Sequence, residues 1–189
     1  KVALVTGGGR GIGQVICREL ARAGADIAVF SRSGASETVK LIESEGGKVL
    51  DIIADATDES SVKEGMKKIM EVYGRLDIVI NNAGVCYHKD AFEATVEEWR
   101  ECLDINLTGE YIVCREAARV MIDNNFKGSI VNIASMSGHI VNVPQCQAAY
   151  NASKAGVIHM TKSLAIEWID KNIRVNSISP GYVATTMSV

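Results

Sequence analysis

Short apolar runs alternate with longer amphipathic segments along the chain. Each run is apolar at successive positions rather than at every second one, which is typical of a strand covered by helices on both faces. The pattern predicts six buried strands, at residues 1–6, 26–31, 48–55, 76–81, 128–135 and 173–179.

The segments between these runs place apolar residues three and four positions apart, the spacing of an amphipathic helix. They predict helices over about 12–23, 35–47, 58–73, 96–124 and 149–170. Gly24 ends the first helix and Asp58 can cap the third. The long helix 96–124 is expected to be interrupted near Asn106.

Alternating strands and helices predict an α/β fold of the Rossmann type. The expected sheet is parallel and doubly wound, with strand order 3-2-1-4-5-6. Length and pattern indicate a single domain over residues 1–189. Because the chain starts within a strand pattern and stops soon after another, we expect a piece of a longer domain.

The segment "TGGGRGIG" at residues 6–13 lies between the first strand and the first helix. Glycines allow the backbone to turn tightly against a pyrophosphate, and the helix N-terminus offers free amides. The alternative is a tight turn that binds no ligand. The expected cofactor contacts here are Gly7, Gly9, Arg10, Gly11, Ile12 and Gly13.

The end of the second strand indicates which dinucleotide is bound. An enzyme that prefers NAD carries an acidic residue about 20 residues past the loop, where it binds the ribose 2′-hydroxyl. Here Ser31 occupies that place and Arg32 follows. An arginine can pair with a 2′-phosphate, so NADP(H) is expected over NAD(H). The alternative is a solvated surface arginine.

Tyr150 and Lys154 are four residues apart and would share one face of a helix. An ammonium beside a phenol favours the phenolate, so Lys154 is expected to lower the Tyr150 pKa. Such a tyrosine could donate or accept a proton near neutral pH. Taken alone, the pair is better explained as an ordinary surface pair, and the rest of the chain must decide.

Composition and residue spacing argue against several kinds of partner and site. The 20 basic and 23 acidic residues give a net charge of −3 without long runs of one sign, so nucleic acid is not an expected partner. No apolar segment reaches the roughly 20 residues of a membrane span. The histidines are isolated, and the cysteines form no metal or disulfide pattern, so no metal site and a cytoplasmic setting are expected. The cysteines are Cys17, Cys86, Cys102, Cys114 and Cys146.

Six motifs together resemble the short-chain dehydrogenase/reductase family over essentially the whole chain. Each is weak alone, but their order and intervals are specific. They are "TGGGRGIG" (6–13), "NNAG" (81–84), Asn106 in "DINLTG", Ser135 in "NIASMSG", "YNASK" (150–154) and "RVNSISPGYVAT" (174–185). The resemblance also implies that the family's last strand is missing from these residues.

The resemblance implies a role for each motif residue. Tyr150 would be the general acid/base, Lys154 would lower its pKa and bind the nicotinamide ribose, and Ser135 would orient the substrate oxygen. Asn106 would hold a water that links Lys154 to solvent. Asp55 would contact the adenine, although Ala56 follows where the family more often has valine or leucine. Further implied cofactor contacts are Asn81, Ala83, Gly84, Pro180, Gly181, Val183 and Thr185.

The position of the catalytic serine needs a choice. Ser135 lies 15 residues before Tyr150, two more than is usual in the family, and Ser137 fits the shorter interval. The strand-end context "NIAS" favours Ser135, with the loop "HIVNVPQCQ" absorbing the extra residues. Ser137 would then be a turn residue before Gly138.

The segment "SMSGHIVNVPQCQAAYNASKAG" resembles the polyol and sugar-ketose reductases of the family. It implies NADP(H)-dependent interconversion of a secondary alcohol and a ketone. The alternatives are a 3-oxoacyl-thioester reductase of fatty-acid synthesis and a catalytically silent nucleotide-binding regulatory protein. Family members pair the helices 96–124 and 149–170 between copies, so a homo-oligomer, a dimer or tetramer, is implied.

Overall fold

The computed structural model describes residues 1–184 and contains one parallel sheet. Its six strands follow the order β3-β2-β1-β4-β5-β6, and every neighbouring pair is parallel, so the predicted fold class and strand order are confirmed. The strands are β1 (Val2–Thr6), β2 (Asp26–Ser31), β3 (Val49–Ile53), β4 (Ile78–Asn81), β5 (Gly128–Ile133) and β6 (Ile173–Ile178).

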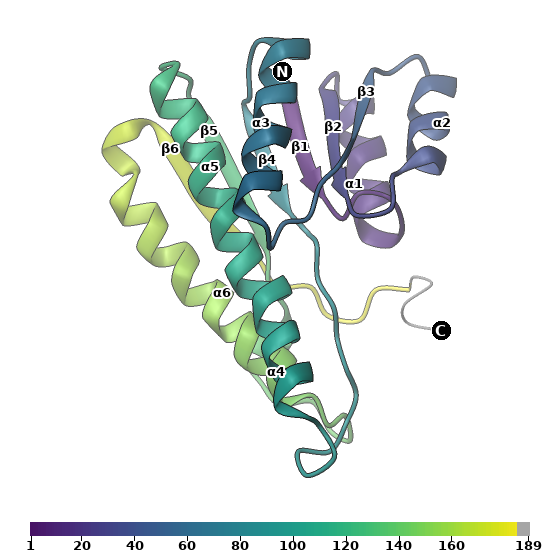
Figure 1. The fold of residues 1–189 in the computed structure, drawn as a ribbon, viewed down its shortest axis with the longest axis vertical. Coiled ribbons are helices and arrows are strands. Elements are labelled where there is room, and N and C mark those ends of the chain that lie inside the picture. Colours follow the sequence, from purple (N-terminus) through teal and green to yellow (C-terminus); the bar gives the residue numbers. More distant parts are fainter. Residues whose placement is uncertain (185–189) are drawn as a thin grey trace.

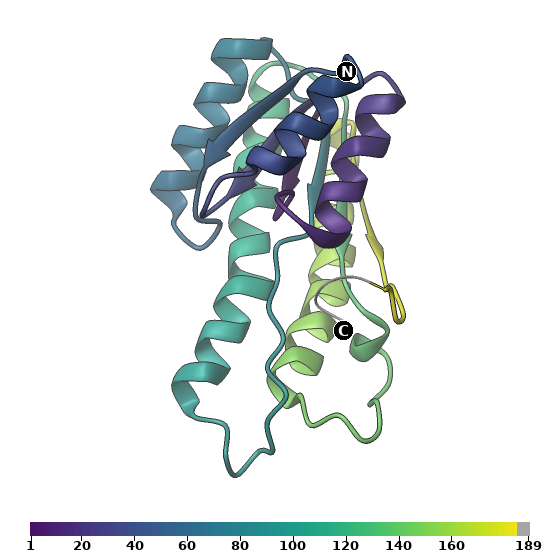
Figure 2. The same ribbon diagram turned by 90° about the vertical axis from the view of Figure 1, so that its right-hand side faces the viewer.

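Helices cover both faces of the sheet. Buried side chains of α3, α5 and α6 pack on one face, and those of α1 and α2 pack on the other. Figures 1 and 2 show this separation: α1 and α2 lie across the strands from α5 and α6. The helices are α1 (Gly11–Arg22), α2 (Ser36–Ser44), α3 (Glu59–Tyr73), α4 (Val96–Leu103), α5 (Gly109–Asp123) and α6 (Ala148–Glu167).

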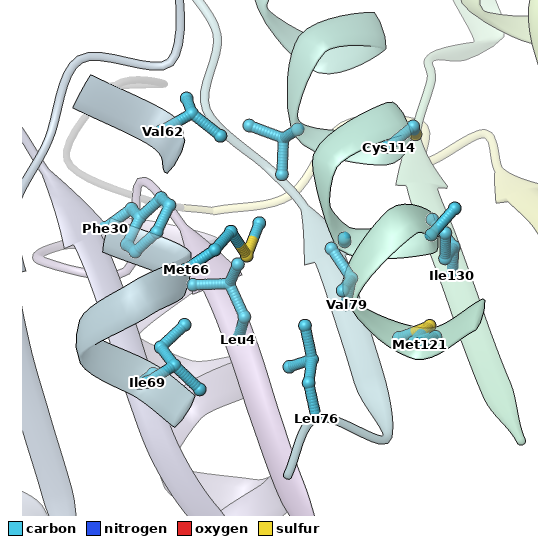
Figure 3. Close-up of a cluster of buried hydrophobic side chains, with 14 of the residues drawn as sticks. Leu4, Phe30, Val62, Met66, Ile69, Leu76, Val79, Cys114, Met121 and Ile130 are labelled. Atoms are coloured by element: carbon cyan, nitrogen blue, oxygen red, sulfur yellow. The ribbon is translucent and has the colours of Figure 1, made fainter. Parts of the chain in front are cut away.

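The larger core lies between the sheet and α3 and α5 (Figure 3). Leu4 and Phe30 of the strands meet Met66 and Ile69 of α3, and all four are at most 3% exposed. Gly65 of α3 lets the helix approach the sheet, because a Cβ there would lie 2.4 Å from Phe30 Cζ. The runs of β1 and β2 are buried along their length because helices cover both faces. The edge strand β6 differs from the prediction, because its residues alternate between buried and exposed and one face is open.

Local signals set several helix ends. The Asp58 side chain accepts a hydrogen bond from Ser60 N at 2.9 Å and caps α3, as predicted. Gly74, at φ 66°, ends the same helix in the left-handed conformation. Thr95 and Glu98 form a reciprocal capping box at the start of α4.

The predicted interruption near Asn106 is a π-helical segment, η1 (Asp104–Thr108), between α4 and α5. Several predicted ends were too long, including those of the helix 35–47, where α2 ends at Ser44, and of the strand 128–135, where β5 ends at Ile133. The third strand stops at Ile53 because Asp55 turns the chain by accepting hydrogen bonds from Thr57. The helix α6 ends at Glu167, and the short 3₁₀ turn η3 (Ile169–Lys171) follows it.

The carboxyl ends of all six strands lie at one edge of the sheet, since the strands are parallel. Beyond this edge, α4 and the first turns of α6 extend past the sheet with their connecting loops (Figure 1). A second 3₁₀ turn, η2 (Met136–Gly138), follows β5 at the same edge. In open parallel sheets this is where ligands bind.

Candidate active site

The glycine loop turns directly from β1 into α1. Gly7 and Gly11 adopt φ 64° and 57°, which side chains rarely allow. A Cβ at Gly13 would lie 2.3 Å from Gly7 O, so helix and loop touch there. Arg10, at the N-cap, makes no side-chain capping bond, and Ile12 follows in the first turn. The first amides of α1 are therefore available to an anion.

Asn82 locks this loop to β4, a role that the sequence prediction missed. Its Nδ2 donates to Thr6 O at 3.1 Å and to Gly7 O at 3.2 Å. Thr6 Oγ1 in turn accepts from the backbone amides of Asn82 and Ala83, both at 3.0 Å. The second asparagine of "NNAG" was the available signal.

Ser31 and Arg32 at the end of β2 are the residues expected to determine whether NADP(H) or NAD(H) is preferred. The Ser31 hydroxyl is buried and has no hydrogen-bond partner among residues 1–184. Arg32 is exposed and borders a groove of about 410 Å³, together with Thr57 and side chains of α4. An orphaned hydroxyl and a cation beside an open groove fit a phosphate-bearing ribose.

Two other predicted cofactor residues make contacts within the protein. Asp55 Oδ1 accepts from Thr57 N at 2.9 Å and from Thr57 Oγ1 at 2.8 Å. The Asn81 side chain lies beneath α5, where Nδ2 donates to Asn132 Oδ1 at 3.0 Å and to Cys114 Sγ at 3.1 Å. The side chain of Asn81 therefore supports the sheet edge from inside.

Ser135 and Tyr150 meet across the end of β5 and the start of α6. The Ser135 hydroxyl acts on the nearby Tyr150 phenol and lowers the pKa of Tyr150 in part. Burial is the larger influence and raises that pKa above its usual value. Ser135 Oγ also accepts from Ser137 N at 3.1 Å, which fixes its direction.

The Ser137 hydroxyl is held by the loop that follows η2. Its Oγ accepts from Asn142 Nδ2 at 2.8 Å and from Gln147 Nε2 at 3.1 Å. Ser137 thus stabilises the loop, while Ser135 faces Tyr150. This geometry supports the choice of Ser135 over Ser137.

Lys154 is only 3% exposed and lies one turn after Tyr150 on α6. Its Nζ donates to Ile133 O at 2.6 Å. We expected Lys154 to lower the Tyr150 pKa, yet the influences that shift this pKa are burial, Ser135 and nearby acidic groups. Burial also lowers the pKa of Lys154, so the ammonium form is less favoured than in water.

Asn106 is fully buried in η1 and joins three segments of the site. Its Oδ1 accepts from Val85 N and its Nδ2 donates to Val85 O, both at 2.8 Å. The same Nδ2 donates to Ser153 Oγ at 3.1 Å, and Ser153 Oγ donates to Tyr150 O at 2.8 Å. Asn106 therefore ties the chain after β4 to the helix that carries Tyr150.

The backbone at Gly84 passes close to this cluster. A Cβ there would lie 3.2 Å from Asn106 Oδ1 and 3.8 Å from Lys154 Nζ. The chain after β6 closes the other side, since Met136 N donates to Pro180 O at 3.0 Å. Gly181 and Val183 follow in the same segment, and Thr185 lies outside the described residues.

Among residues 1–184, no helix is both long enough and apolar enough to span a bilayer. Within the same residues, no three or more His, Cys, Asp or Glu side chains gather as a metal site would require. The five cysteines are free thiols.

Known proteins resemble the chain in sequence and in structure. The family model of the short chain dehydrogenases matches residues 1–189. An NADP-dependent mannitol dehydrogenase of Alternaria alternata is 41% identical over 194 residues, covering 100% of this chain and 72% of the relative. A sorbose reductase of Candida albicans is 39% identical over 193 residues, covering 100% and 68%.

Solved structures of similar proteins have the same fold. A short-chain type dehydrogenase/reductase from Mycobacterium marinum superposes with a TM-score of 0.95 at 39% identity, covering 96% of this chain and 74% of that one. The matches in sequence and in fold extend over the glycine loop, the sheet edge and the Ser135–Tyr150 region. The chain therefore belongs to the short-chain dehydrogenase/reductase family, a family of oxidoreductases that bind NAD(P).

Proposed function

We propose that this protein is an NADP(H)-dependent reductase that interconverts a secondary alcohol and a ketone, with a polyol or sugar ketose as substrate. The observation that carries the proposal is the cluster at the sheet edge, where the Ser135 hydroxyl lies near the Tyr150 phenol and lowers its pKa in part. Buried Lys154 and Asn106 lie beside Gly84, where the backbone passes without a side chain. A hydroxyl donor, an acid/base phenol and a cation in one place suit proton transfer to a carbonyl oxygen.

The side chains of the protein transfer one proton to or from the substrate oxygen. The bound nicotinamide supplies or accepts the hydride. In ketone reduction Tyr150 donates its proton to the substrate oxygen, and in alcohol oxidation it accepts one. Ser135 donates a hydrogen bond to the same oxygen through its hydroxyl hydrogen, while its Oγ accepts from Ser137 N and is held in place. The glycine loop and the α1 amides hold the pyrophosphate.

A matched pair of serine variants tests the catalytic assignment. Ser135→Ala should lower the ketone reduction rate by about 100-fold, because it removes a donor to the developing oxyanion. Ser137→Ala should leave the rate within about threefold, since Ser137 only holds the loop. The rate of NADPH oxidation, followed by absorbance, measures both. Loss of activity in Ser137→Ala alone would show that the assignment is off by two residues.

The cofactor preference rests on Ser31 and Arg32. A buried hydroxyl without a partner and an adjacent exposed guanidinium suit a 2′-phosphate and offer no carboxylate to a 2′-hydroxyl. NADPH should therefore bind at least about tenfold more tightly than NADH. The double variant Ser31→Asp/Arg32→Ala should reverse the order. Equal or tighter binding of NADH by the unaltered protein, in a fluorescence titration, would refute the preference.

The substrate class is supported by relatives and not by a free polar side chain. Gln147 is 7% exposed and donates both Nε2 hydrogens within the protein, to Asn151 Oδ1 at 3.0 Å and to Ser137 Oγ at 3.1 Å. Similar proteins include a sorbose reductase, a mannitol dehydrogenase and an arabinitol 2-dehydrogenase. A panel of ketoses beside a 3-oxoacyl thioester tests this, and turnover of the thioester alone would reject it.

We further propose that the whole protein is a homo-oligomer that pairs through α5 and α6. Tyr111 of α5 is 40% exposed and Ile166 of α6 is 74% exposed, and Trp99 of α4 is 41% exposed nearby. Ile166→Asp should shift the protein toward monomer in light scattering. Val15→Asp is the control, because Val15 is a similarly exposed apolar residue on α1. An unaltered protein that is monomeric at micromolar concentration would refute the proposal.

A further inference from the structure

A buried hydroxyl of α6 bonds two residues of the site and is not used by the proposed reaction. Ser153 is 0% exposed and lies between Tyr150 and Lys154 in the sequence. Its Oγ donates to Tyr150 O at 2.8 Å and accepts from Asn106 Nδ2 at 3.1 Å. Because its hydrogen and a lone pair are both used within the protein, Ser153 acts on these partners and not on a substrate.

The Asn106 amide fixes the direction of both bonds. Its Oδ1 accepts from Val85 N and its Nδ2 donates to Val85 O, so turning the amide over would set donor against donor and acceptor against acceptor. Nδ2 therefore keeps its second hydrogen for Ser153 Oγ, with the weaker acceptor Cys102 Sγ at 3.4 Å. The Ser153 hydrogen is then directed to Tyr150 O.

The π-helical segment η1 brings Asn106 against α6. A Cβ at Gly156 would lie 2.8 Å from Leu107 Cδ2, so the two elements are in close contact beside Ser153. A regular α-helix turns by about 100° per residue, so without η1 the side chain facing Ser153 would be a different one. π-helical turns are frequent at functional sites, and here the turn serves the bond between Asn106 and Ser153.

Another hydroxyl of α6 makes the same two kinds of bond away from the site. Thr161 is 4% exposed, and its Oγ1 donates to Val157 O at 2.7 Å and accepts from Asn132 Nδ2 at 3.0 Å. It lies about three helical turns after Tyr150. Ser153 and Thr161 are thus alike in burial and bonding, and they differ in the carbonyl that each one holds.

We propose that Ser153 is a positioning residue for Tyr150: its hydroxyl couples the Tyr150 backbone to Asn106, and through Asn106 to Val85 in the chain after β4. The Tyr150 phenol is thereby held at a fixed place relative to Gly84, an expected cofactor contact. A helical carbonyl already faces the amide four residues later, so Ser153 adds a second donor that restrains this turn of α6. This inference rests on the proposed function, in which Tyr150 transfers the proton.

The expected loss of rate follows from the geometry of proton transfer. The phenol oxygen must come within about 2.6–3.2 Å of the substrate oxygen. A misplacement of about 1 Å can cost about 100-fold in rate. Removal of the Ser153 hydroxyl leaves the bonds between Asn106 and Val85 and the contact of Gly156 with η1 in place, so the displacement is smaller. A loss of about tenfold in kcat is therefore expected.

The test compares Ser153→Ala with Thr161→Val in the whole protein, because each removes one buried hydroxyl and leaves an asparagine amide without its partner. Both should raise the unfolding equilibrium constant in urea by about tenfold. Only Ser153→Ala should lower kcat for ketone reduction by about tenfold, while its NADPH affinity stays within about twofold. Thr161→Val should keep kcat within about twofold. An unchanged kcat in Ser153→Ala, or an equal loss in both variants, would overturn the proposal.

A thiol at the same position gives a graded variant. Cys114 shows that a thiol can serve between two asparagines, since its Sγ accepts from Asn81 Nδ2 at 3.1 Å and donates to Asn132 Oδ1 at 3.3 Å. Ser153→Cys should therefore recover part of the loss, with kcat about threefold below the unaltered protein. If Ser153→Ala does not fold, this threefold loss with normal NADPH binding becomes the test, and a full rate would refute the role. If neither variant folds, Ser153 serves the fold and the proposal is wrong.

Amide hydrogen exchange tests the link to Tyr150 without a substrate. In Ser153→Ala the amides around Tyr150 should exchange about tenfold faster, whereas in Thr161→Val the faster exchange should be confined to the turn around Thr161. Exchange around Tyr150 that matches the unaltered protein would contradict the coupling. An unaltered protein that reduces no ketone would refute the proposed function, and faster exchange around Tyr150 would still support the coupling through Ser153.

Discussion

Replacing Gly13 by alanine should damage the dinucleotide site more than any other single methyl group in the glycine loop. The new Cβ would lie 2.3 Å from Gly7 O and 2.5 Å from Asn82 Nδ2. Neither neighbour can rotate away, because one is backbone and the other holds Thr6 O and Gly7 O. The loop must therefore move away from β4.

The magnitude follows from three contributions. Alanine stabilises a helix interior by about 1 kcal/mol relative to glycine, which reduces the loss. Overpacking costs about 1–3 kcal/mol, and each hydrogen bond of Asn82 that breaks costs about 1 kcal/mol. The sum is a loss of about 2–4 kcal/mol in the free energy of unfolding. Because the loop that moves is also the loop that binds pyrophosphate, NADPH affinity should fall by about 30-fold or more, roughly 2 kcal/mol.

The assay is a fluorescence titration with NADPH, combined with urea unfolding in the absence of cofactor. Gly9→Ala is the matched control in the same loop, since its Cβ would lie 3.2 Å from Gly34 O and needs only a small adjustment. It should change the affinity by less than about fivefold. If Gly13→Ala bound NADPH as tightly as the unaltered protein, the close contact between α1 and the loop would not constrain the site.

Three further predictions concern the phenol, the core and a helix cap. In the cofactor-free protein Tyr150 should ionise above pH 10 because burial raises its pKa, so stability is lost only as the pH rises through that value. An ultraviolet difference titration against Tyr150→Phe measures it, and ionisation near pH 8 would contradict it. Gly65→Ala should cost about 1–3 kcal/mol in urea unfolding, since the Cβ would lie 2.4 Å from Phe30 Cζ; a stabilised variant would contradict this packing. Asp58→Ala should cost about 1 kcal/mol by removing the bond from Ser60 N, and an unchanged melting temperature would contradict the cap.

The order of elements could be predicted because it depends on local patterns. Apolar runs such as residues 2–5 have no polar face, so they must be covered on both sides, and the alternation with helices then leads to a parallel sheet. The turn at Gly7 and the cap at Asp58 are likewise local. The predicted ends of β3 and α6 failed because a side chain two residues away and a terminal 3₁₀ turn decide them.

The serine choice shows where local reasoning becomes weak. Interval counting favoured Ser137 and strand context favoured Ser135, and both are compatible with the sequence. The structure separates them by their partners: Ser135 meets Tyr150, and Ser137 accepts from Asn142 and Gln147. Those partners come from other elements, so spacing alone could not identify them.

The sequence by itself determined the fold class, the strand order, the glycine loop and the family, because each depends on residue type at fixed spacing. Only the tertiary structure decided the electrostatics of the site. Whether Lys154 lowers the Tyr150 pKa depends on burial, on the carbonyl of Ile133 and on the buried Glu110. These are properties of distance and solvent exclusion between distant segments, and a linear pattern does not contain them.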